Sequence, residues 1–190
     1  MMLPDQIEDI VTRLKSGDIT LIPTDSIWGI SCDAFNESAV QKITALKQLE
    51  ENHQYILLTS SIEMLNGYIE MMHPRIETLL SLHKKPLTLI HTSKTIPQHL
   101  VSPDGTVGMR VTQHPLGVAI IEELGHPIIS TRACMVGEDY PKTFEDISGT
   151  IRTGVDFVPA YPSSILNKEY SELSVIAKYD KEGELFFVRM

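Results

Sequence analysis

Cysteine is scarce in this sequence, with Cys32 and Cys134 the two examples among 190 residues. They lie far apart and form no C-x-x-C pair, which excludes a disulfide framework and gives no support to a zinc site. The seven histidines are scattered without ligand-like pairs. We therefore expect no metal site built from protein ligands.

Positive charge is also in short supply. The chain carries 16 lysines and arginines against 25 aspartates and glutamates, a formal net charge of -9. A chain of this charge repels a polyanion as a whole. Any contact with nucleic acid therefore has to come from a local patch.

Long apolar runs are missing as well. Apolar residues make up 42% of the chain, yet no segment approaches the roughly 20 consecutive apolar residues that a membrane-spanning helix requires. The start, MMLPDQIEDIVTRLKSG, lacks the basic-then-apolar order of a signal peptide and instead predicts an amphipathic helix. We expect a cytoplasmic protein that does not engage a membrane.

Two glycine-rich phosphate loops are absent. The G-x-x-x-x-G-K-S/T spacing that wraps phosphates is missing around Gly105 and Gly108, and no G-x-G-x-x-G follows an expected strand. A prediction of ATP binding cannot rest on these motifs.

The sequence does contain an alternation of helix and strand patterns. Helices are predicted at 4–16, from the Asn36 cap through Leu46, in a short segment capped by Ser60 or Ser61, from Pro74 through Leu82, at 115–124 and at 144–151. Strands are predicted at 19–22, 55–58, 87–90, 106–111, 128–130 and 157–158, with a hairpin of 173–179 and 184–189. No repeat or linker divides the chain, so we predict one α/β domain over residues 1–190, with a twisted mixed sheet flanked by helices.

Polar side chains at strand ends are the candidate site residues, because open sheets bind ligands where strands give way to loops. Each of these side chains also has an explanation that needs no function: it belongs to a turn, it is a threonine favoured in strands, or it is a solvated charge at a sheet edge. Lys47, at the end of a predicted helix, could meet an anion or merely favour the negative end of the helix dipole. The strand-end candidates are Pro23-Thr24-Asp25-Ser26, Thr88, Arg110 and Ser130-Thr131-Arg132.

Cys134 lies two residues after Arg132, and a nearby cation would favour its thiolate as a nucleophile. Against this, no histidine partner can be nominated from the sequence, and small thiols near strand ends are mostly packing residues. Met64, Met71 and Met72 fall near helical spacing, which predicts either core positions or the face of a homodimer.

Five segments, in order along the chain, resemble motifs of the YrdC/Sua5 family. Residues 17–29 contain GDI and then PTDSIWG, similar to the family's opening strand and P-T-D/E-T-x-Y-G, with Trp28 in place of the usual tyrosine. Residues 43–47 resemble the helix that ends in I-K-x-R, and 86–90 the P-x-T-L-I strand. Residues 107–111 resemble the V-G-x-R strand, 129–131 the start of S-T-S-A-N, and 162–165 more weakly a late P-S-T-I-V element.

Family members make threonylcarbamoyl-adenylate for a universal tRNA modification at the adenosine beside the anticodon. The resemblance thus implies a reaction of L-threonine, bicarbonate and ATP that gives threonylcarbamoyl-AMP and pyrophosphate in a basic cavity, usually with Mg2+ and without a tightly bound cofactor. Charge-assisted donors suit the carboxylate and phosphates of these substrates. Carried over by position, Thr24, Thr88 and Arg110 would bind threonine or line its site, Lys47, Ser130 and Ser164 would face the nucleotide, and Lys47 and Arg110 become the candidate catalytic residues.

Besides Trp28, the sequence departs from the family pattern at four positions. Leu49 stands at the arginine of I-K-x-R, Arg132 and Cys134 replace the second serine and the asparagine of S-T-S-A-N, and Thr112 replaces a proline. Arg132 could supply the phosphate contact that Leu49 cannot make. Alternatively, because losing one charged donor can cost about 10²–10³ in rate, the chain is a catalytically degenerate relative that binds nucleotide, tRNA or structured RNA.

Overall fold

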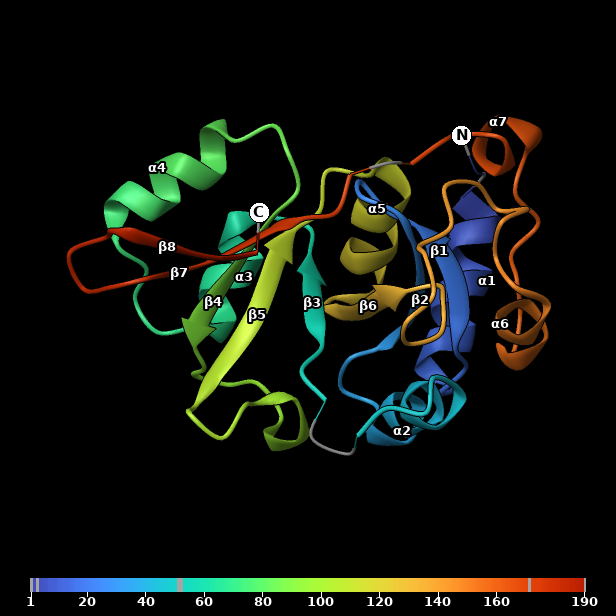
Figure 1. Ribbon diagram of the computed structural model, residues 1–190, viewed down its shortest axis with the longest axis horizontal. Helices are drawn as coiled ribbons and strands as arrows, with labels where there is room; N and C mark the ends of the chain where they lie inside the picture. Colours follow the sequence, from blue (N-terminus) through green and yellow to red (C-terminus); the bar gives the residue numbers. More distant parts are fainter. Residues whose placement is uncertain (1, 3, 51–52, 171, 190) are drawn as a thin grey trace.

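An eight-stranded mixed sheet organises the molecule (Figure 1). The computed structural model describes residues 2, 4–50, 53–170 and 172–189. The strands are β1 (Thr20–Pro23), β2 (Trp28–Asp33), β3 (Ile56–Thr59), β4 (Leu87–Thr92), β5 (Thr106–Val111), β6 (Ile128–Arg132), β7 (Val175–Tyr179) and β8 (Leu185–Arg189). Their order across the sheet is β1-β2-β6-β3-β5-β4-β7-β8, with β3–β5 and β4–β7 parallel and the other neighbours antiparallel.

Helices gather at both ends of this sheet. They are α1 (Pro4–Lys15), α2 (Glu37–Leu46), α3 (Ile62–Tyr68), α4 (Pro74–Leu82), α5 (Pro115–Leu124), α6 (Gly149–Gly154) and α7 (Ser163–Leu166), with a 3-10 turn η1 (Gln98–Leu100). Figure 1 shows α3 and α4 near β4, β7 and β8, and α1, α2 and α6 near β1 and β2. The predicted α/β fold, a mixed sheet flanked by helices, is confirmed.

Several predicted boundaries rest on visible local interactions. The Asn36 side chain accepts a hydrogen bond from the Ala39 backbone N–H at the start of α2, and Ser61 does the same for Met64 at the start of α3. Gly125 ends α5 in the left-handed conformation, with φ 86°. These caps place the helix ends where the sequence predicts them.

Three elements of the structure differ from those expected. The sequence analysis places no strand at residues 28–33, yet β2 is buried along its whole length and pairs with both β1 and β6. The helix predicted at 144–151 begins at Gly149, because the Asp146 carboxylate accepts backbone N–H groups from Lys142 and Thr143 and holds a turn instead. The strand predicted at 157–158 is a single bridge between Phe157 and Thr20.

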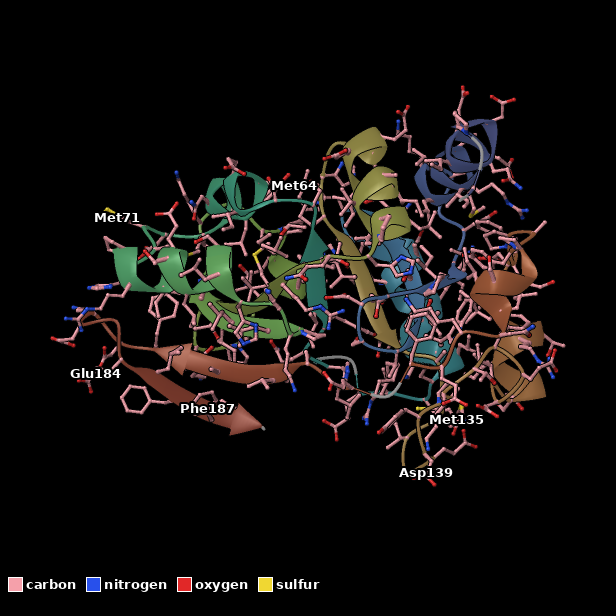
Figure 2. All side chains as sticks on the ribbon, turned by 90° about the horizontal axis from the view of Figure 1, so that it is seen from above. Met64, Met71, Met135, Asp139, Glu184 and Phe187 are labelled. Atoms are coloured by element: carbon pink, nitrogen blue, oxygen red, sulfur yellow. The ribbon has the colours of Figure 1, made fainter. Side chains whose placement is uncertain are left out.

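The methionines divide between core and surface. Met72 is buried and Met64 packs against the core, whereas Met71 is 97% exposed (Figure 2). The prediction of core positions is therefore confirmed for Met64 and Met72 and is wrong for Met71. None of the helices in the described ranges is long and apolar enough to cross a membrane.

Candidate functional site

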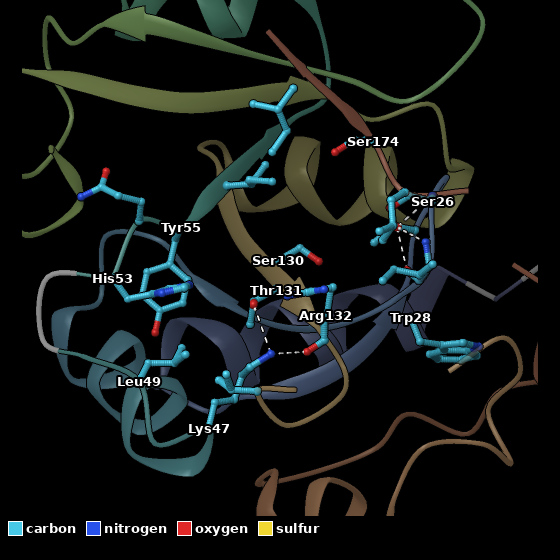
Figure 3. Close-up of a pocket in the computed structure, with 18 of the residues that line it drawn as sticks. Ser26, Trp28, Lys47, Leu49, His53, Tyr55, Ser130, Thr131, Arg132 and Ser174 are labelled. Atoms are coloured by element: carbon cyan, nitrogen blue, oxygen red, sulfur yellow. Dashed lines mark hydrogen bonds between the residues drawn. The ribbon is translucent and has the colours of Figure 1, made fainter. Parts of the chain in front are cut away.

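A cavity of about 530 Å3 lies where segments from across the chain converge (Figure 3). The turn after β1, the end of α2, the start of β3, the strands β5 and β6, and the approach to β7 all contribute to its wall. The lining includes seven of the candidate residues, namely Thr24, Ser26, Lys47, Arg110, Ser130, Thr131 and Arg132.

Lys47 supplies a buried ammonium group to this wall. It follows the last turn of α2, and 4% of the residue is exposed. Its Nζ donates to Thr131 Oγ1 at 3.4 Å and to the backbone carbonyl of Arg132 (Figure 3). Burial lowers the pKa of Lys47 to about 8, with Cys134 opposing and Arg132 reinforcing the shift. The group is thus mainly charged at pH 7, and its remaining N–H can meet an anion.

Arg132 places a second cation beside Lys47. The residue is exposed at the end of β6, and its guanidinium makes no ion pair with any residue in the described ranges. Burial together with the charges of Lys47 and Arg132 holds the pKa of His53 below its usual range, so that the imidazole is neutral near pH 7. We call Lys47, His53 and Arg132 the basic cluster.

Leu49 reaches the cavity wall because of the way α2 ends. Gln48 adopts a left-handed conformation, with φ 53°. The N–H groups of Gln48 and Leu49 donate back to the carbonyls of Ala45 and Thr44, the pattern of a Schellman motif. An apolar side chain therefore stands near the basic cluster at the position where the family motif has arginine.

Arg110 is held by the carboxylate of Asp25, from another of the candidate strand ends. Its Nη2 lies 3.3 Å from Asp25 Oδ1, and the two side chains are 5% and 11% exposed. Thr112 donates its hydroxyl to the same oxygen at 3.1 Å, and its backbone N–H donates to the Thr59 carbonyl. Proline, the family residue at position 112, could make neither bond, so the threonine extends the β3–β5 pairing and supports Asp25.

Thr24 lies in the cavity wall, but its hydroxyl is engaged within its own turn. Oγ1 donates to the Ile27 carbonyl at 2.7 Å and accepts from the backbone N–H groups of Ser26 and Ile27. These bonds shape the turn after β1 that carries Asp25 towards Arg110. Ser26, from the same strand end, also lines the cavity.

Ser130 depends on a glycine in the adjacent strand. A Cβ atom on Gly29 would collide with Ser130 Oγ. The glycine therefore leaves room for the hydroxyl beside the cavity, which explains a glycine in the middle of buried β2.

Thr88 and Ser164 are not among the residues that line this cavity. Thr88 is buried in β4 and donates at 3.0 Å to Ser174 Oγ, which does line it. Ser164 is exposed on α7. The structure thus connects Thr88 to the cavity through Ser174, for which the sequence offers no signal, and leaves the ligand role of Ser164 a prediction.

Trp28 contributes to the cavity wall, and its ring belongs to an aromatic cluster outside the lining. Its ring is fully buried and makes edge contacts with Phe144, Tyr161 and Tyr170 at centroid distances of 5.2, 5.4 and 6.2 Å. Tyr161 donates its hydroxyl to the Leu21 carbonyl. Tryptophan in place of the family's tyrosine therefore packs as a core residue at this position.

Cys134 does not have the character of an activated thiol. Burial raises the pKa of this thiol above its ordinary value, although Lys47 and Arg132 act in the opposite direction. Both cysteines are free and buried. The thiol-nucleophile interpretation thus loses its physical basis.

Comparison with known proteins agrees with this fold and cavity. A family model named for Sua5, YciO and YrdC and described as telomere recombination matches residues 12–181. A protein named threonylcarbamoyl-AMP synthase from Escherichia coli O1:K1 / APEC is 28% identical over 167 residues, which cover 86% of this chain and 88% of that protein.

Two solved structures share the fold. The crystal structure of E. coli YciO has a TM-score of 0.82 at 21% identity and covers 100% of this chain and 90% of that one. The P. abyssi Sua5 structure complexed with L-threonine has a TM-score of 0.81 at 19% identity over 97% of this chain. The match spans 54% of that longer protein. With the family model covering most of its length, this chain belongs to the Sua5/YciO/YrdC family.

Proposed function

We propose that this protein is a threonylcarbamoyl-AMP synthase, which joins L-threonine, bicarbonate and ATP and releases pyrophosphate. The observation that carries the proposal is the basic cluster in the wall of a 530 Å3 cavity. There a buried lysine with a pKa of about 8 lies beside an arginine that has no ion-pair partner in the described part of the chain. Relatives at 28% identity that bear the synthase name support the same assignment.

The reaction has two steps. The threonine amine attacks the bicarbonate carbon with loss of water to give a carbamate, and a carbamate oxygen then attacks the α-phosphorus of ATP as the bond to pyrophosphate breaks. Negative charge builds on the departing pyrophosphate, where Lys47 and Arg132 would stabilise it through charge-assisted hydrogen bonds. Arg110, oriented by Asp25, would bind the threonine carboxylate at the other side of the cavity.

Magnesium belongs to this proposal only as a companion of ATP. The described residues contain no group of three His, Cys, Asp or Glu side chains that could hold a resident ion. Magnesium usually binds through substrate phosphates with few protein ligands. We therefore treat Mg-ATP as the substrate and assign the ion no protein ligand.

A second candidate is a non-catalytic nucleotide- or RNA-binding relative. The observation that favours it is Leu49, which lines the cavity where the family motif has arginine, with Glu50 next to it. Leucine cannot donate to a phosphate, and the glutamate opposes an anion. If Arg132 does not make the phosphate contact in its place, the protein would still bind nucleotide or RNA but would not catalyse the reaction.

A pyrophosphate-release assay with ATP, threonine and bicarbonate separates the two candidates. A synthase releases pyrophosphate only when all three substrates are present, and Lys47→Met should abolish release while the protein stays folded. The exposed Lys42, on the same helix and paired with Asp156 outside the cavity, provides the matched control as Lys42→Met. Saturable ATP or tRNA binding without threonine-dependent release would overturn the synthase assignment.

A further inference from the structure

A second cavity, of about 910 Å3, lies between α1, α5 and α7 and shares no lining residue with the first. It is found at the end of the molecule that carries the N-terminus (Figure 1). Its floor is apolar, with Ile7 from α1, Leu116 and Ala119 from α5 and Ile165 from α7. The volume is at the upper end of the range of about 300–1,000 Å3 for ligand sites, and we call this feature the helical groove.

The rim of the helical groove carries uncompensated negative charge. Glu8 of α1 and Glu122 and Glu123 of α5 line it, and none of the three forms an ion pair within the described residues. The one lysine in the lining, Lys168, has its ammonium 5.0 Å from the centre of the Tyr170 ring. Three carboxylates against one ammonium favour a positively charged occupant.

We propose that the helical groove binds a basic amphipathic helix of a partner protein. A groove between helices with an apolar floor accepts apolar residues spaced three and four apart, and acidic rims select lysine or arginine on the flanks. A second copy of this chain is a poor occupant, because it brings a net charge of -9 to an acidic surface. The proposal concerns a surface outside the first cavity and does not depend on the proposed activity.

The native chain contains a reporter for occupation of the groove. Tyr170 lines the groove and makes an edge contact at 6.2 Å with Trp28, the single tryptophan. His114, also in the groove wall, donates its backbone N–H to Thr112, whose hydroxyl binds the Asp25 that orients Arg110. A helix that displaces Tyr170 should therefore change the fluorescence of Trp28.

The test titrates the full chain with synthetic leucine–lysine peptides of about 18 residues, or five helical turns. One peptide places leucines on one helical face, one has the same composition in scrambled order, and one replaces lysine with glutamate. Fluorescence anisotropy of labelled peptide and emission of Trp28 are read together. We expect saturable 1:1 binding of the amphipathic lysine peptide alone, with a change in Trp28 emission at the same midpoint.

Groove variants identify the site. Combining Glu122→Lys with Glu123→Lys should weaken binding about tenfold, since each reversed rim charge is worth a few-fold, and Ala119→Trp should block it by filling the floor. Glu63→Lys, on the exposed surface of α3, reverses one charge outside the groove and should leave affinity unchanged. Equal binding of the scrambled or acidic peptide, indifference to the groove variants, or self-association of the chain abolished by Ala119→Trp would each overturn the proposal.

Discussion

The pKa of Lys47 leads to a specific prediction for the pH dependence of ATP binding. Burial depresses this pKa from 10.5 to about 8. The ammonium is therefore about 90% protonated at pH 7 and about 10% protonated at pH 9, by the usual titration relation. An anion binds the protonated form, so affinity should fall as pH rises through 8.

The size of the effect follows from these populations. If Lys47 contacts a phosphate, the dissociation constant for ATP should rise about tenfold between pH 7 and pH 9, equivalent to about 1.4 kcal/mol. Arginine stays charged over this whole range, so Lys47→Arg should bind with little change between the two pH values. Lys42→Arg, on the exposed face of the same helix, should keep the wild-type slope.

Isothermal titration calorimetry of each protein with ATP at half-unit pH intervals measures the effect. Circular dichroism at each pH verifies that the chain remains folded. The reasoning is refuted if the wild-type affinity is flat from pH 7 to 9, or if Lys47→Arg shows the same decline as the wild type. Either result would mean that the Lys47 ammonium does not meet the ligand.

Three further predictions concern other parts of the molecule. Arg132→Ala should weaken ATP binding by about 1–3 kcal/mol, and adding Leu49→Arg should restore part of the loss. If titration calorimetry finds neither effect, Arg132 does not replace the phosphate contact that Leu49 cannot make. Gly29→Ala should lower the free energy of unfolding by about 1–3 kcal/mol, because the added Cβ meets Ser130 Oγ. The cost should be smaller in a Ser130→Ala background. Denaturant unfolding of the double-mutant cycle measures both costs, and equal costs would contradict the prediction. Burial lowers the pKa of His91 to about 4. Between pH 6.5 and 4 the unfolded chain therefore binds more protons at this residue than the folded chain. The free energy of unfolding should fall by up to about 3 kcal/mol as the pH drops through that range. In urea unfolding, His91→Gln should reduce the dependence of the free energy of unfolding on pH in this range. If that dependence is unchanged in the variant, other groups cause it.

Much of the fold was predictable because local rules and global packing agree. The Asn36 and Ser61 caps, the proline starts of α4 and α5 and the Gly125 end of α5 each depend on residues within one turn of chain. β2 escaped prediction for the opposite reason. Its run WGISCD separates the apolar residues Trp28, Ile30 and Cys32 by glycine, serine and aspartate, which are typical of turns. Pairing with β1 on one edge and with the distant β6 on the other makes this segment a buried strand.

The candidate site divides in the same way. Motif order identified Thr24, Lys47, Arg110 and Ser130, and a departure from the motif identified Arg132; the fold brings all five to one cavity. Ser174 and His53 lie in the same cavity without any motif to announce them. Their presence there follows from strand pairings between segments distant in sequence, which no local pattern encodes.

By itself, the sequence determined the class of fold, the order of its main elements and the positions where this chain departs from its family. Tertiary structure alone decided the surroundings of the candidate site residues. Burial lowers the pKa of Lys47 to about 8, and β6, more than 80 residues away in sequence, supplies the hydrogen-bond acceptors of its ammonium group at Thr131 and Arg132. Arg110 is paired because the turn after β1 meets β5. Charge and burial depend on neighbours in space, and those neighbours are set by packing of the whole chain.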